Sequence, residues 1–132
     1  MVEHITDEAL AYRLPLPPHK IASRQAQRVL EWALRDWGVN DVSVENARIV
    51  VSELVANALT HSIDVFTLTL RLAENGVLVE VWDSSDTLPV VGLPDGLSIN
   101  GRGMFLVDAL SKEWSVTHES EGGKTVWARI AL

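Results

Sequence analysis

The sequence has no cysteine among its 132 residues, so disulfide bonds and thiolate metal sites are excluded. Basic residues are also few: 11 Lys and Arg stand against 18 Asp and Glu, which gives a formal net charge of −7. A nucleic-acid surface would need clustered Lys and Arg, and this balance argues against one. No apolar run reaches the length of a membrane span, and no signal-peptide pattern opens the chain. We therefore expect a cytoplasmic protein that binds neither nucleic acid nor membrane.

Familiar catalytic patterns are missing as well. The sequence has no Ser/His/Asp order, no nucleophile-elbow glycines and no Walker-type Gly-x-x-x-x-Gly-Lys. Its four histidines are scattered, so they do not indicate a metal site. The composition, 47% apolar and 22% charged, is that of an ordinary globular protein of one domain. We expect a disordered N-terminus over residues 1–9 and a single domain over residues 10–132.

Apolar residues at helical spacing predict three helices, over residues 19–37, 41–61 and 103–110. Gly38 stands where a glycine commonly ends a helix. Asn40 or Asp41 can cap the second helix, which should run to about His61.

Alternating apolar residues predict five strands, over residues 11–16, 65–72, 77–82, 114–118 and 125–132. Asn75-Gly76 is a strong hairpin signal between two of them. A loop of about 17 residues over 84–100 is long for so small a domain, which favours a functional role. Because strands and helices are segregated along the chain, we predict an α+β fold. Its form is a two-layer α/β sandwich, in which helices cover one face of a mixed, mostly antiparallel sheet.

The most informative segment is the second half of the long predicted helix. Glu53, Asn57 and His61 are four residues apart, so they share one face of a helix that is otherwise apolar. Polar groups there are costly unless a partner pairs with them, as a cation and nucleotide phosphates would. The amide oxygen of Asn57 suits Mg²⁺, and Glu53 could act as a general base. The alternatives are a solvated helix face and, for His61, a favourable place in the last helical turn.

Two further segments fit a nucleotide site. Asp83 follows a strand directly, where its carboxylate could accept a hydrogen bond from an exocyclic amine such as that of adenine. It could equally be a turn residue that bonds its own backbone. Gly101-Arg102-Gly103 opens a predicted helix, whose free amides attract phosphate, and Arg102 could add a charged contact. The alternative is a flexible loop end with a surface arginine.

The last segment of interest is Gly122-Gly123-Lys124-Thr125. Its glycines are most simply those of a hairpin turn. Thr125 could place a hydroxyl near a ligand through water, and we expect Lys124 to be solvated.

Together these segments resemble the Bergerat-fold ATPases, the group of gyrase, heat-shock chaperone, mismatch-repair and histidine-kinase ATP-binding domains. Within that group the chain looks most like the small anti-sigma-factor serine kinases of bacteria, in particular their actinobacterial relatives. The resemblance runs from about Arg13 to Leu132. It is carried by four segments in a specific order and spacing, at residues 51–58, 81–84, 101–107 and 123–127.

The resemblance implies an ATP site between the second helix and the sheet. Asn57 would coordinate the Mg²⁺ that bridges the phosphates, and His61 would lie on the phosphate side. Asp83 would hold the adenine amine with support from Thr125, and Glu53 would be the base for a serine hydroxyl. The turn formed by Gly101, Arg102 and Gly103 would meet the phosphates, and residues 86–100 would form a short lid.

The resemblance also implies partners. In this family the substrate is an antagonist protein with a STAS-type fold, and the kinase sequesters a sigma factor, typically as a homodimer. Ser84-Ser85-Asp86-Thr87 stands where the wider group has Gly-x-Gly after the aspartate, as in the actinobacterial branch.

Two other functions compete with a serine kinase. One is a catalytically weak or inactive module that works by protein binding alone, for which Glu53 would not be needed. The other is a histidine-kinase catalytic domain, which commonly carries Asn at the position of Glu53 and needs a helical hairpin for which we see no room.

Overall fold

The computed structural model describes residues 3–6, 10–88 and 99–132. Its six strands form one sheet in the order β1-β2-β3-β4-β6-β5, and every neighbouring pair is antiparallel. The strands are β1 Glu3–Thr6, β2 Leu10–Leu16, β3 Phe66–Ala73, β4 Gly76–Asp83, β5 Glu113–His118 and β6 Lys124–Ala131. The helices are α1 Ile21–Asp36, α2 Asp41–His61 and α3 Ile99–Leu110.

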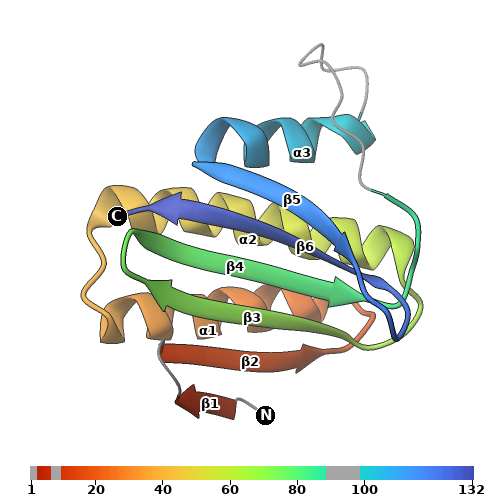
Figure 1. The fold of residues 1–132 in the computed structure, drawn as a ribbon, viewed down its shortest axis with the longest axis horizontal. Helices are drawn as coiled ribbons and strands as arrows, with labels where there is room; N and C mark the ends of the chain where they lie inside the picture. Colours follow the sequence, from red (N-terminus) through yellow and green to blue (C-terminus); the bar gives the residue numbers. More distant parts are fainter. Residues whose placement is uncertain (1–2, 7–9, 89–98) are drawn as a thin grey trace.

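The helices cover one face of the sheet. In Figure 1 the sheet lies in front, α1 and α2 lie behind it, and α3 packs against α2 and β5. The predicted α+β sandwich is confirmed, with all the described strand pairs antiparallel. None of the helices in the described ranges is long and apolar enough to cross a membrane.

The sheet and α2 share a core built by alternation. Along β4 and β6 every second side chain is buried against the helices, and the residues between them face the other way. The apolar face of α2 is fully buried at Ala47, Val50, Val51, Leu54, Val55 and Ala58. Leu59 packs partly buried against the same core. Alternation therefore decides which side chains of each strand can meet α2.

Local signals fix the ends of the first two helices. Trp37 ends α1, and Gly38 follows with a φ of 67°, a left-handed conformation that favours glycine. The Asn40 side chain accepts a hydrogen bond of 2.9 Å from the Ser43 amide, which confirms the predicted cap of α2. This cap matters because α2 carries the polar stripe.

The Asn40→Ala variant should lower the free energy of unfolding by about 1 kcal/mol, because an amide of the first turn loses its acceptor. Urea denaturation would measure the change. Ser52→Ala, at an exposed position of the same helix, is the control and should change stability by less than about 0.5 kcal/mol. Equal stability of both variants with the unchanged chain would contradict the role of the cap.

Two elements differ from the prediction. Glu3–Thr6, in the segment expected to be disordered, forms β1 and pairs antiparallel with β2. The third helix begins at Ile99, four residues before the predicted start at Gly103. Gly101, Arg102 and Gly103 consequently lie inside the first turns of α3, and the free amides of that helix belong to the residues from Ile99 on.

Several segments that carry predicted site residues lie at one end of the molecule. The C-terminal end of α2, the end of β4, the β5–β6 turn and the start of α3 all lie at the right of Figure 1. Segments that are far apart in the sequence therefore lie at the same end of the molecule.

Candidate functional site

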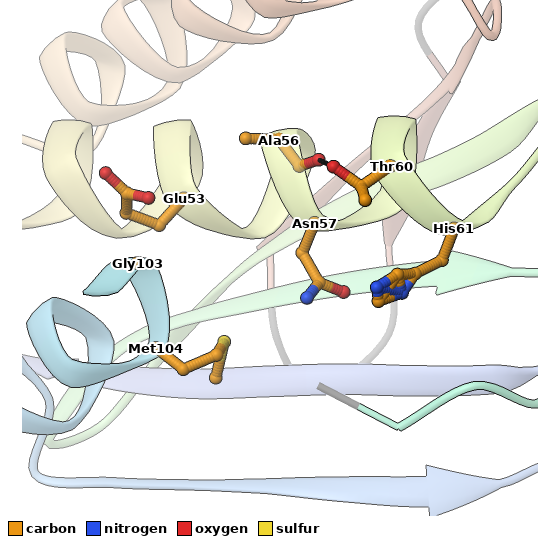
Figure 2. Close-up of a pocket in the computed structure, with 7 residues that line it drawn as sticks. All are labelled: Glu53, Ala56, Asn57, Thr60, His61, Gly103 and Met104. Carbon is orange, nitrogen blue, oxygen red and sulfur yellow. Dashed lines mark hydrogen bonds between the residues drawn. The ribbon is translucent and has the colours of Figure 1, made fainter. Parts of the chain in front are cut away.

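The polar stripe of α2 lines a cavity beside α3. Glu53, Asn57 and His61 are all half-buried, as expected for three residues on one helix face. Figure 2 shows Asn57 and His61 directed from α2 toward the same space. The cavity has a volume of about 160 Å³ and is lined by Glu53, Ala56, Asn57, Thr60, His61, Gly103 and Met104. The structure thus brings together four of the eight predicted site residues: Glu53, Asn57, His61 and Gly103.

Gly103 sets the room available to the Glu53 side chain. A Cβ atom at Gly103 would overlap Glu53 Oε2 and would lie 3.3 Å from Cδ of the same carboxylate. The glycine lets α3 approach α2 beside Glu53, and both residues line the cavity (Figure 2). Met104, the next residue, is fully buried and anchors this turn of α3 in the core.

The donor set suits the metal and phosphate end of a nucleotide. His61 Nδ1 is buried and has no hydrogen-bond partner among the described residues, while other atoms of this side chain line the cavity. No three His, Cys, Asp or Glu side chains cluster as metal ligands in the described ranges. Mg²⁺ commonly binds through one or two protein oxygens together with substrate phosphates, which fits a lone Asn57 amide. The cavity is smaller than the range of about 300–1,000 Å³ common for ligand sites, so it fits one end of a nucleotide.

Asp83 lies on the core face of the sheet and is 1% exposed. Its carboxylate pairs with the Lys124 ammonium at 2.9 and 3.0 Å, and Lys124 is 0% exposed. The expectation that Lys124 is solvated is therefore wrong. Lys124 is buried because the strand register places it directly opposite Asp83 of β4, on the face that packs against α2.

A sequence signal for the buried lysine exists. Val126, Ala128 and Ile130 are the core-facing residues of β6, and Lys124 continues their alternation by one step. A lysine at the head of an apolar face, opposite an aspartate in the neighbouring strand, indicates a buried ion pair.

Asp83 also accepts a hydrogen bond from the backbone of the turn that follows it, as the alternative interpretation of the sequence predicts. The Ser85 amide donates a hydrogen bond of 2.9 Å to Asp83 Oδ1. Gly123, at a φ of 78°, lies so close that a Cβ atom there would overlap the Asp83 carbonyl oxygen. The end of β4 and the start of β6 are thus locked together.

Thr125 lies on the other face of the sheet. Its hydroxyl donates a hydrogen bond of 2.7 Å to Glu119 Oε1, and its neighbours are residues of the face that the helices leave open. Thr125 and Lys124 are adjacent in a strand, so only one of them can point toward α2. The structure does not bring Thr125 to the cavity or to the Asp83 carboxylate.

The remaining predicted contacts lie at the start of α3. The backbones of Gly101 and Arg102 belong to its first turn. The lid predicted over residues 86–100 includes residues 89–98, which lie outside the described ranges.

Comparison with known families agrees with this geometry. The family described as "Histidine kinase-like ATPase domain" matches residues 16–130, which is most of the chain. A search of curated proteins found no significant match. The matched range contains all eight predicted site residues and both partners of the buried ion pair.

Proposed function

The chain belongs to the family of histidine kinase-like ATPase domains, which bind ATP, and from this premise we propose that it is a protein serine kinase and anti-sigma factor. It phosphorylates a STAS-type antagonist in the cytoplasm and sequesters a sigma factor, acting as a homodimer. The observation that carries the proposal is that Glu53 and Asn57, one helical turn apart on α2, line the same cavity. That pairing gives one helix face both a metal ligand and a base.

The three polar residues of the α2 stripe have distinct tasks in this proposal. Asn57 would hold Mg²⁺ beside the phosphates of ATP, and His61 would lie on the phosphate side of the site. A magnesium ion bound at Asn57 would supply positive charge to the phosphates during transfer. Glu53 takes the proton of the serine hydroxyl as that oxygen bonds to phosphorus. The amides at the start of α3, at Gly101 and Arg102, meet the phosphates.

Glu53 is the residue that favours transfer over simple binding. A module that works by contact alone has no need of a half-buried carboxylate beside its metal ligand, and solvent exposure would suit such a residue better. One observation favours the second candidate, a binding module with weak or no kinase activity. The ion pair with Lys124 occupies Asp83, the residue proposed to hold adenine.

The Gly103→Ala variant should fold and yet transfer phosphate poorly. Alanine is the better helix former, and the end of a flexible Glu53 side chain can move away from the new methyl group. The melting temperature should therefore be unchanged or higher. Transfer should fall by about 100-fold, because a misplacement of about 1 Å in a catalytic group has that effect. Rate and melting temperature measured together test this, and an unchanged rate would show that Gly103 does not position Glu53.

The proposal is tested by transfer itself. The purified protein would be incubated with Mg²⁺ and ATP labelled in the γ-phosphate, together with STAS-domain proteins of the same organism one at a time. We expect one of them to gain a phosphate on serine, located by mass spectrometry. ATP binding without phosphorylation of any of these proteins would favour the binding module instead.

A further inference from the structure

The Lys124–Asp83 pair leaves Asp83 without an accessible oxygen. Lys124 Nζ lies 2.9 Å from Oδ1 and 3.0 Å from Oδ2, and the Ser85 amide donates to Oδ1 as well. The two side chains are 0% and 1% exposed. A base that entered this end of the site would meet a carboxylate that is already bound on both oxygens.

The ammonium is equally well satisfied. It has three N–H donors, two of which reach the Asp83 oxygens, and the Ser85 carbonyl lies 3.4 Å away as a third acceptor. Breaking a buried pair leaves two uncompensated charges, which is strongly unfavourable. A neutral exocyclic amine offers only one ordinary hydrogen bond in exchange. The amine of adenine therefore cannot displace Lys124 from Asp83.

The backbone places the two residues of the pair opposite each other. Asp83 and Lys124 are direct cross-strand partners in the β4–β6 ladder. Gly123 packs so closely against the backbone of Asp83 that an added Cβ atom would lie 3.1 Å from the Asp83 carbonyl carbon. The register fixes where both side chains leave the backbone, and their burial leaves neither of them in contact with solvent.

We infer that Lys124 is a specificity-determining residue of the nucleotide site: it binds the Asp83 carboxylate and so removes selection for the exocyclic amine of adenine. Affinity then comes from the triphosphate and metal end at Asn57 and His61. The ligand class is purine nucleoside triphosphates with either an amine or a carbonyl at position 6. This inference rests on the proposed nucleotide site, and it deepens the proposed function by defining what the site does not recognise.

The test compares ATP with inosine triphosphate, which carries a carbonyl in place of the amine. Calorimetric titrations with Mg²⁺ should give the unchanged protein the same affinity for both nucleotides within about twofold. The Lys124→Thr variant frees Asp83, and threonine suits a strand. It should prefer ATP by about tenfold or more, as expected for one hydrogen bond to a charged acceptor.

A matched control removes a cross-strand cation from the opposite face. Arg71 of β3 pairs with Glu80 of β4 at 2.9 Å on the face that the helices leave open. Arg71→Thr should keep the ratio of the unchanged protein, because this pair does not contact the site. Thermal melting of all three proteins shows that each is folded.

The outcomes separate this inference from the proposed function. A preference of tenfold or more for ATP in the unchanged protein overturns the inference, while it supports the nucleotide site. This result needs no variant, so the test holds even if Lys124→Thr does not fold. An unaltered ratio in a folded Lys124→Thr variant also overturns the inference. Binding of neither nucleotide to any of the proteins overturns the proposed function, and the inference with it.

Discussion

The Asn57→Ala variant should lose Mg²⁺-dependent nucleotide binding. Asn57 is the one amide oxygen of the α2 stripe that lines the cavity, and the described residues offer no cluster of carboxylates or imidazoles that could replace it. Loss of groups that only orient metal ligands weakens metal sites by about 10–100-fold, and loss of a direct ligand should weaken ATP binding by at least about 100-fold. Calorimetry with Mg²⁺ present measures this effect.

The control for this variant removes a carboxamide elsewhere. Asn75 is exposed in the β3–β4 turn, at the opposite end of the sheet, and adopts no left-handed conformation that alanine would strain. Asn75→Ala should bind ATP as the unchanged protein does. If Asn57→Ala also kept its affinity for ATP and the dependence of that affinity on Mg²⁺, Asn57 would not be the metal ligand.

The Glu53→Gln variant should bind ATP normally and fail to transfer phosphate. Glutamine keeps the size of the side chain and its fit against Gly103, but it cannot accept the proton of the serine hydroxyl. Removal of a general base lowers rates by about 10²–10⁴-fold, so kcat should fall by that factor while the ATP affinity stays within about twofold. Single-turnover transfer and calorimetry measure the two quantities separately.

A matched substitution tests whether charge alone matters. Glu45 lies on the same helix, is exposed, and makes only a 3.9 Å ion pair with Arg48. Glu45→Gln removes the same charge away from the cavity and should leave both the rate and the affinity unchanged. Equal rates for Glu53→Gln and the unchanged protein would exclude Glu53 as the base.

Features that depend on local periodicity could be predicted from the sequence. The stripe of Glu53, Asn57 and His61 follows from 3.6 residues per turn, and the α2 cap follows from the place of Asn40. The two-layer fold follows from the segregation of helices and strands. The stripe and the cap each lie within one segment, and the order of elements is read along the chain, so none of these signals needs the pairing of distant residues.

Features that depend on pairing between segments were missed. The β1 strand forms because β2 offers an edge to Glu3–Thr6, and nothing in those four residues indicates it alone. The Gly-Gly-Lys-Thr turn suggested a solvated Lys124, while the β4–β6 register places this lysine in the core beside Asp83. Thr125, the next residue of β6, then points to the open face. Register is a property of two strands together, which a pattern within one strand cannot fix.

The central claim is that the cavity between α2 and α3 is the metal and phosphate end of an ATP site. Titration of the purified protein with ATP, in the presence and absence of Mg²⁺, tests it most directly. We predict binding that depends on Mg²⁺, because in the proposed site Asn57 would hold the metal through one oxygen and the phosphates would supply others. Binding that is equal without Mg²⁺, or no binding at millimolar ATP, would contradict the account.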